Sequence, residues 1–231
     1  MKTLLNLVLF VCVSLQAHGG LVGVLSTESA GLVSGGKTWG SGGEGLTVSW
    51  MVSRNDDGTW HYEYSFSNAG GGTLKMEVSH FIISVSDNLT PSDVFNFGGD
   101  VQDTELRTFG DEPSNPGFPA GRSMYGLKID LKGEQAAAAF DSVRVPMWGD
   151  FYAKGGGNPK NYACNSDLGA AVANPHDYLA APIDADGNPL FKILVPDTHS
   201  DVPEPAMLTM LGLGALALIH KKPVQEVTAC L

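Results

Sequence analysis

The sequence predicts an all-β protein, a single antiparallel β-sandwich of jelly-roll type. Apolar and polar residues alternate in several short runs, with the period of two that is typical of half-buried strands. Turn-forming residues separate these runs, and the chain of 231 residues contains 29 Gly and 13 Pro. No convincing helical period occurs within residues 20–200, so we expect one sandwich domain there, with targeting segments on either side.

The clearest strand pair spans residues 46–67. Four aromatic side chains share one face of its second strand: Trp60, Tyr62, Tyr64 and Phe66. Residues 46–53 precede this strand, and the turn residues 54–58 join the two, which predicts a hairpin. Aromatic residues at every second position are typical of the core face of a sheet, and His61 and Glu63 then face solvent. The alternative is an exposed platform that stacks on sugar rings.

The next strands follow in chain order. Apolar residues occupy even positions over 74–78 and odd positions over 81–85, which predicts a β-bulge or a bend near Ser79-His80. Alternation over 125–131 predicts another strand.

Val143 and Val145 alternate in the same way and predict an additional strand, and residues 191–195 predict the closing one. Residues 111–121 contain three prolines, so we expect an exposed loop there, and another at 155–159. The Gly- and Ser-rich residues 19–45 predict either a loosely ordered leader or widely spaced edge strands.

Residues 1–19 have the pattern of a secretory signal peptide. Lys2 is the positive start, residues 4–13 are apolar except for one Asn, and small residues offer cleavage sites after Ala17 or Gly19. We therefore expect export and processing by signal peptidase.

The C-terminal region has three consecutive parts. The first is the motif Val202, Pro203, Glu204 and Pro205, the second is the apolar run 206–219, and the third is a basic stop at Lys221 and Lys222. The prolines keep the motif extended and accessible. The apolar run predicts a hydrophobic helix that is short beside the roughly twenty residues of a membrane span, so snorkelling lysines would complete the anchor. Residues 223–231 form a short tail.

This order of motif, apolar run and basic stop resembles the PEP-CTERM sorting signal of exported bacterial proteins. The same type of tail also carries an ice-binding-protein C-terminal label. The resemblance covers residues 201–222 and implies cleavage by a membrane-embedded exosortase after a period of anchoring. It also implies a final location at the cell surface or outside the cell, often beside extracellular polysaccharide. It implies no activity for the passenger, residues 20–200.

Charge and cysteine content exclude several classes of function. The net charge is −11 and no basic patch occurs, which argues against nucleic-acid binding. Cys12 lies in the signal peptide and Cys230 beyond the apolar run, so Cys164 is alone in the passenger. We expect an inert buried thiol there. No Cys or His pair has metal-ligand spacing, and we expect no metal and no cofactor.

Three local patterns are candidates for chemistry. Trp148 and Tyr152, in a Gly-containing segment, are the candidates for an exposed sugar contact. Residues 184–188 resemble part of a calcium loop, but Pro189 and the missing twelfth-position Glu favour a simple turn. His176-Asp177 resembles half of an acid–base pair, yet no G-x-S-x-G motif completes a triad. The sequence nominates no catalytic residue.

Three functions remain open. The leading one is a non-catalytic protein of the cell surface or extracellular matrix, anchored by residues 206–219 until an exosortase acts. The first alternative is a secreted carbohydrate-binding module, which predicts exposed aromatic residues in a groove. The second is a secreted hydrolase, which predicts a cleft with convergent carboxylates or a His–acid pair.

Overall fold

The computed structural model describes residues 20–28, 31–36, 39–40, 45–132, 136–156 and 160–200. Within these ranges the regular elements are strands β1 to β13 and one short 3-10 turn, η1 (Pro91–Asp93). Each ladder between named strands is antiparallel. The predicted antiparallel all-β fold is therefore confirmed. The predicted signal peptide and apolar C-terminal helix lie outside the described residues, and the described part contains no helix able to span a membrane.

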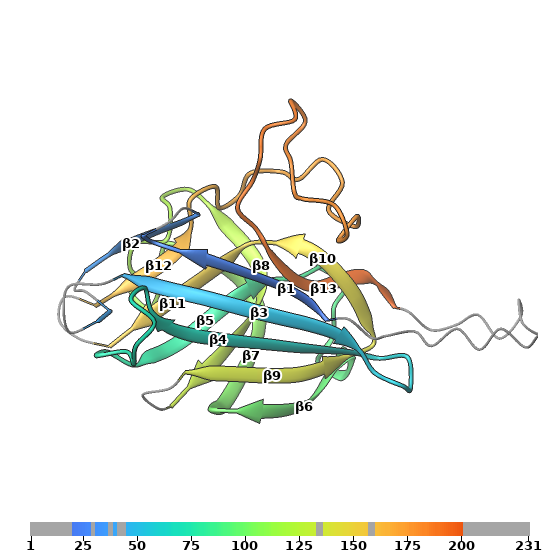
Figure 1. Cartoon of the computed structure of the whole chain (residues 1–231), viewed down its shortest axis with the longest axis horizontal. Helices are drawn as coiled ribbons and strands as arrows, with labels where there is room; N and C mark the ends of the chain where they lie inside the picture. The colour runs from blue at the N-terminus through green and yellow to red at the C-terminus, as the bar shows by residue number, and fades with distance from the viewer. Residues whose placement is uncertain are drawn as a thin grey trace, which may run out of the picture.

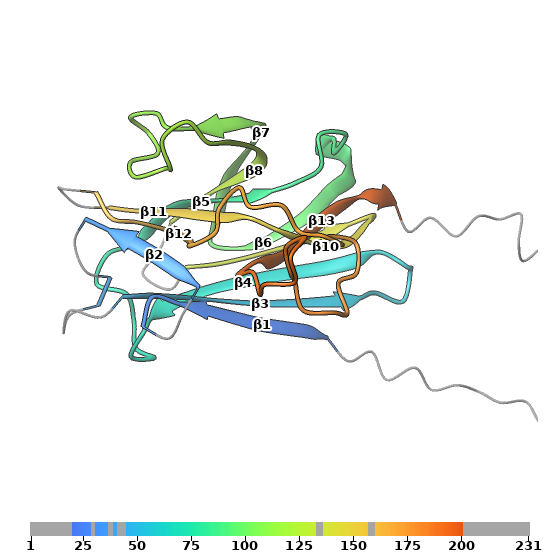
Figure 2. The ribbon, with the colours of Figure 1, turned by 90° about the horizontal axis from the view of Figure 1, so that it is seen from above.

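Two large sheets face each other. The first has the strand order β1 (Leu21–Ser26), β3 (Leu46–Arg54), β4 (Trp60–Asn68), β9 (Ala137–Ser142) and β6 (Val94–Gly99). The second has the order β2 (Leu32–Gly35), β12 (Tyr162–Asn165), β11 (Phe151–Gly155), β5 (Val78–Ser84), β8 (Ser123–Leu131) and β7 (Val101–Gly110). Figure 1 shows the five-stranded sheet in front, and Figure 2 shows the two layers from above.

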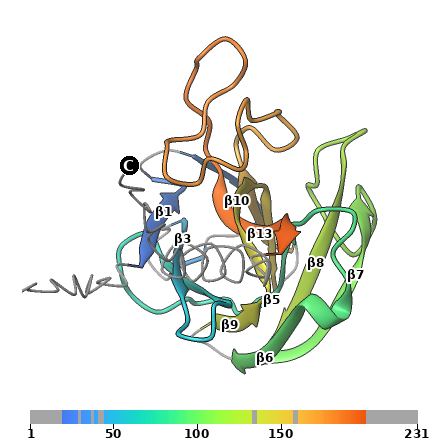
Figure 3. The same cartoon turned by 90° about the vertical axis from the view of Figure 1, so that its right-hand side faces the viewer.

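A third, two-stranded ladder joins β10 (Arg144–Gly149) to β13 (Ile193–Ser200). A long irregular segment, residues 166–192, precedes β13 and projects from the sandwich beside this ladder (Figures 1 and 3). The closing strand thus begins two residues later than the predicted 191–195 and continues further. The sandwich is confirmed, and its jelly-roll connectivity stays a prediction.

Apolar faces of both sheets meet in one core. The predicted hairpin is confirmed, because β3 and β4 pair from Leu46 with Asn68 to Arg54 with Trp60. Alternation along these strands places one side chain in the core and the next outside, as the period of two requires. The fully buried aromatic side chains of the five-stranded sheet, Tyr62, Tyr64 and Phe140, therefore pack toward the six-stranded sheet.

The predicted irregularity near Ser79-His80 is confirmed as a β-bulge. In the ladder of β11 with β5, Lys154 pairs with His80 but Gly155 pairs with Val78, so Ser79 is the extra residue. The preceding strand prediction is wrong, because β5 begins at Val78 and residues 74–76 lie outside any strand.

The loop of residues 111–121 is confirmed as a loop but is not simply exposed. Asn115 and Phe118 are buried, with 1% and 3% of their surface accessible. Phe118 joins a small second cluster with Phe109 and Tyr152 on the far side of the six-stranded sheet. The expectation of a wholly exposed loop is wrong because three prolines block strand pairing without preventing burial of the side chains between them.

The predicted strand around Val145 is confirmed as β10, but it also buries an arginine that was not anticipated. Val143 separates β9 from β10. On β10, Arg144 and Pro146 are buried, and Val145 and Met147 at the alternate positions pack against the core. The Arg144 guanidinium donates to Asp93 Oδ2 at 2.7 Å and to the carbonyl oxygen of Asn88 at 2.9 Å. A buried guanidinium is accommodated because these acceptors replace water.

The Gly-rich N-terminal region forms edge strands, which was the second of the two alternatives. β1 pairs with β3 at one edge of the five-stranded sheet, and β2 pairs with β12 at one edge of the six-stranded sheet. Gly23 is needed on β1 because a Cβ there would lie 2.0 Å from the indole ring of Trp50. The glycines thus permit close approach within a sheet.

Candidate functional site

The aromatic side chains of β4 belong to the core. Their accessible fractions lie between 0% and 7%. The hydroxyl of Tyr62 donates to the carbonyl oxygen of Arg144 at 2.9 Å, and that of Tyr64 donates to the carbonyl oxygen of Leu194 at 2.8 Å. Burial raises the pKa of both phenols well above the ordinary value. The core-face prediction is confirmed, and a sugar platform on this stripe is excluded.

The nominated sugar contacts differ in their placement. Tyr152 is fully buried, and its hydroxyl donates to the carbonyl oxygen of Pro116 at 2.8 Å. Its nomination as an exposed contact is therefore corrected, since both faces of the central strand β11 are covered. Trp148 is half-buried, and its indole N–H donates to the carbonyl oxygens of Asp177 and Ala180 at 3.2 and 2.9 Å. Trp148 thus holds the long irregular segment against β10.

The segment that resembled a calcium loop is a turn, as favoured. The carboxylate of Asp184 accepts hydrogen bonds from the backbone N–H groups of Asp186 and Asn188, at 2.9 and 2.8 Å. The side-chain amide of Asn188 donates to the same carboxylate, and this bond is the main cause that lowers the pKa of Asp184. Among the described residues, no group of three or more His, Cys, Asp or Glu side chains is arranged to hold a metal ion.

His176 does form an acid–base pair, but with a distant partner. Its Nδ1 lies 2.5 Å from Oδ2 of Asp197 on β13, rather than beside the adjacent Asp177. The His176 side chain is 55% exposed, whereas that of Asp197 is 1% exposed. A buried carboxylate thus orients an accessible imidazole at the base of the long segment.

Cys164 is an inert thiol, as expected. It is 1% exposed on β12, and burial raises its pKa to about 11. A thiol with that pKa is not a thiolate at neutral pH, so it is a poor nucleophile and a poor metal ligand.

A polar cluster around Asp141 was not recognised in the sequence. It lies on the outer face of the five-stranded sheet, where Asp141 pairs with His61 of β4 on one side and Phe95 of β6 on the other. The carboxylate accepts hydrogen bonds from Asn55 Nδ2 at 3.3 Å, His61 Nδ1 at 2.7 Å and Asn96 Nδ2 at 2.8 Å.

The geometry of this Asp141 cluster includes local strain. Burial raises the pKa of Asp141, but the bonds from Asn96, His61 and Asn55 outweigh it and leave the pKa below its ordinary value. Asn96 has a φ of 53°, in the left-handed region, at a register shift in β6 between Phe95 and Gly98. The strained backbone directs the amide of Asn96 onto Asp141.

The rest of this outer face carries small hydroxyl and apolar side chains. In the β3–β4 ladder, Thr47 faces Ser67 and Ser49 faces Ser65, while exposed Val22 and Val24 extend the face onto β1.

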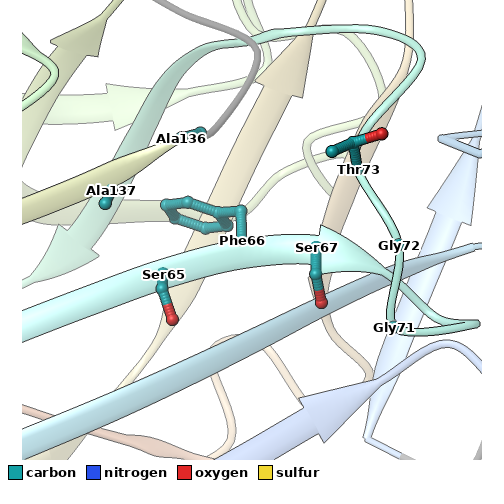
Figure 4. Close-up of a pocket in the computed structure, with 8 residues that line it drawn as sticks. All are labelled: Ser65, Phe66, Ser67, Gly71, Gly72, Thr73, Ala136 and Ala137. Carbon is teal, nitrogen blue, oxygen red and sulfur yellow. The ribbon is translucent and has the colours of Figure 1, made fainter.

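A hollow of about 450 Å³ opens at the far end of β4 from Asp141, lined by residues 65–67, 71–73 and 136–137. Figure 4 shows Ser65 and Ser67 on one side of β4 and Phe66 on the other. Among the described residues that line the hollow, none has a charged side chain.

The comparison with protein families decides one point. Residues 201–222 match the family model of the PEP-CTERM protein-sorting motif. The suspected sorting tail is therefore confirmed, and it includes Val202 to Pro205 and the two lysines of the basic stop. The motif indicates an exported protein that an exosortase processes. No curated protein and no solved structure matches the chain.

The sorting motif begins where the described fold ends. Strand β13 closes at Ser200, and the match starts at the next residue. The motif residues and the predicted anchor 206–219 lie outside the described residues, so the anchor and its snorkelling lysines stay predictions.

Proposed function

We propose that the chain is a non-catalytic protein of the cell surface or extracellular matrix, anchored by residues 206–219 until an exosortase acts. We further propose that the outer face of its five-stranded sheet contacts neutral extracellular polysaccharide. The observation that carries this second step is the Asp141 cluster beside a sheet face whose outward side chains are mostly small and many of them hydroxyl-bearing.

The charge distribution supports a neutral polymer as partner. The chain as a whole has a net charge of −11. On β3, β4 and β9, however, the outward positions are mostly Ser, Thr and Ala, with Glu63, His61 and Asp141 as the ionisable groups. A surface that is low in charge costs less to dehydrate against a neutral polymer than a strongly charged one.

The Asp141 cluster supplies directional groups for hydroxyls. A sugar hydroxyl both donates and accepts, so it pairs with a carboxylate and an amide held side by side. Asp141 and Asn96 are held in that way, and His61 adds an imidazole side chain that is 34% exposed. From His61 to Ser65 the strand advances roughly 13 Å, at about 3.3 Å per residue. This stretch of β4, from His61 to Ser65, is long enough to contact more than one sugar unit.

The ionisation of the carboxylates favours binding over hydrolysis. A glycosidase needs a carboxylic acid whose pKa is raised so that it can protonate the leaving oxygen. The carboxylates with a shifted pKa in the described part, Asp57, Asp93, Glu112, Asp141 and Asp184, all shift downward. The Asp141 cluster therefore acts as a fixed acceptor of hydrogen bonds.

Binding to a panel of neutral polysaccharides tests the proposed face. The panel would include dextran, starch, xylan, mannan and a mixed-linkage β-glucan, run as affinity gels with the passenger. Ser65→Glu places a charge on this outer face of β4 and should weaken binding about tenfold, because the charge must be dehydrated without a partner. Thr108→Glu adds the same charge at an exposed position of β7 in the other sheet and should bind like the unaltered protein. Retention by none of these gels, or equal loss in both variants, would refute the proposal.

Expression with and without the cognate exosortase tests the anchoring and processing. Intact-mass measurement should show loss of the tail after the Pro203–Pro205 region only when the enzyme is present. A chain released to the medium with residues 206–231 intact would contradict it.

A further inference from the structure

A buried lysine lies in contact with two aspartates at the base of the long irregular segment. Lys192 directly precedes β13, and its side chain is 1% exposed. Its Nζ lies 2.6 Å from Oδ1 of Asp150, which separates β10 from β11, and 3.5 Å from Oδ1 of Asp167, which follows β12. It also donates to the carbonyl oxygen of Asp167 at 3.0 Å. Three separate segments therefore meet at one amine.

Further donors fix the orientation of the Asp150 carboxylate. Asn165 Nδ2 donates to its Oδ1 at 2.8 Å, and the backbone N–H of Gly169 donates to its Oδ2 at 2.9 Å. Asn165 Nδ2 also contacts Asp167 Oδ1 at 2.7 Å, so one amide links both carboxylates. The Asp150 and Asp167 side chains are 14% and 16% exposed, respectively. Water has limited access, and neither oxygen of Asp150 can turn without losing a bond.

We propose that Lys192 and Asp150 form an intramolecular amide bond. The Nζ–Cγ bond forms and one Cγ–O bond of Asp150 breaks. The ammonium and the carboxylate together hold the atoms of the amide plus one water, so the step needs no oxidant, reductant or other reactant.

Asp167 is the group that moves the protons. Its carboxylate accepts a proton from the Lys192 ammonium, which frees the amine lone pair to attack Cγ of Asp150. The protons lost by nitrogen are transferred to the oxygen of Asp150 that departs as water. The N–H donors from Asn165 and Gly169 stabilise the oxygens of the tetrahedral intermediate, as an oxyanion hole does. Asp167 ends as it began, an ionised carboxylate.

Confinement favours the condensation. The amine and the carboxyl are held in contact by the fold, which removes the entropic cost of a bimolecular encounter and corresponds to a very high effective concentration. Limited water at the site works against the reverse hydrolysis. Neither argument applies to an exposed ion pair such as Arg107 with Glu105.

The bond would tie the closing strand into the sandwich. It joins residues 42 positions apart and locks the base of β13 to the junction of β10 and β11. Within the described residues Cys164 is the cysteine, and it is free, so no disulfide serves this purpose. A covalent link restricts the unfolded chain in the same way as a disulfide does.

Mass spectrometry of the exported protein tests the bond. The full gene and its Lys192→Arg variant would be expressed in the same exporting host, and both passengers weighed intact. The substituted guanidinium preserves the positive charge but is not a nucleophile near neutral pH, because it stays protonated. After correction for the substitution, the unaltered protein should be lighter by one water. A protease digest should contain a branched peptide that joins Asp150 to Lys192, with no tryptic cleavage after Lys192.

The controls separate this bond from other losses of mass. A water lost elsewhere, for example by cyclisation at Asp186-Gly187, would be lost by both proteins and leaves no branched peptide. Asp167→Asn should form the bond at least tenfold more slowly, because the proton acceptor is gone, while the same ion pair with Asp150 remains. Equal corrected masses for the unaltered protein and Lys192→Arg would overturn the proposal. A deficit of one ammonia would place the bond at Asn165 and overturn the assignment to Asp150.

Discussion

Lowering the pH should destabilise the sandwich through His80, a buried histidine at the bulge of β5. His80 is 4% exposed, and its Nε2 lies 3.1 Å from Oδ1 of Asn115. Burial lowers its pKa to about 4, and the charges of Lys154 and Lys128 act in the same direction. The Asn115 hydrogen bond and the charge of Asp130 oppose the shift without cancelling it. The folded protein therefore keeps this imidazole neutral.

The sign and size of the effect follow from the two pKa values. The unfolded chain has the ordinary value of 6.5 and the folded chain about 4, so the unfolded state binds the proton first as the pH falls. The contribution to stability is present above pH 6.5 and is lost as the pH falls from 6.5 toward 4. Between pH 7 and pH 5 the loss from this residue alone is about 2 kcal/mol.

Urea unfolding at pH 7 and pH 5 measures this loss, with the passenger and its His80→Gln variant compared. Gln stays neutral, so the variant should lose about 2 kcal/mol less than the unaltered protein over this interval, whatever its stability at pH 7. His61→Gln, which alters a partly exposed histidine on the outer face, should retain the His80-dependent loss. An equal loss in His80→Gln and the unaltered protein would refute the reasoning, because it would mean that His80 does not titrate differently on unfolding.

Three further substitutions probe the packing, each followed by urea unfolding at pH 7. Tyr64→Phe should cost about 1–3 kcal/mol because it leaves the carbonyl oxygen of Leu194 unpaired, whereas Tyr125→Phe, whose hydroxyl makes no hydrogen bond among the described residues, should cost much less. Arg144→Met should lower the free energy of unfolding by about 3–5 kcal/mol, because Asp93 then keeps a partly buried charge without its guanidinium partner. An unchanged free energy of unfolding would mean that apolar packing can replace this ion pair. Gly126→Ala should cost about 1–3 kcal/mol because the added Cβ would lie 2.8 Å from a backbone oxygen of β5; an unchanged midpoint would show that β8 can shift.

The sequence predicted those parts of the fold whose burial is one-sided and regular. The aromatic alternation of β4 is read directly because one face is core and the other is solvent. Prediction was poorer where both faces are covered: residues 80–83 of β5 are all buried, so periodicity cannot show which way each side chain points. The burial of Arg144 on β10 was not anticipated, because a guanidinium is buried only when distant acceptors meet it.

The candidate sites depend on contacts between residues that lie far apart in the sequence, so the sequence alone does not show which residues meet. His176 was noticed, but its partner Asp197 lies 21 residues away on another strand. The Asp141 cluster joins residues as much as 86 positions apart. Asp141 itself lies on β9 after a run of alanines, and no strand was predicted there from the sequence. The one available signal was the position of His61 in the alternation of β4, which places its side chain on the face opposite the core. The sorting motif was readable because it acts as a linear sequence.

Strand β13 links the folded domain to that motif, and its contacts predict how processing affects stability. The strand is held by the hydroxyl of Tyr64 on Leu194 and by the ladder from Met147 with Val195 to Gly149 with Ile193. All of these contacts precede the motif, which begins at residue 201. Cleavage within the motif should therefore leave the urea midpoint of the detergent-solubilised precursor and that of the processed protein equal. A lower midpoint after processing would show that residues beyond Ser200 contribute to the fold, and that the exosortase removes part of the domain as well as its anchor.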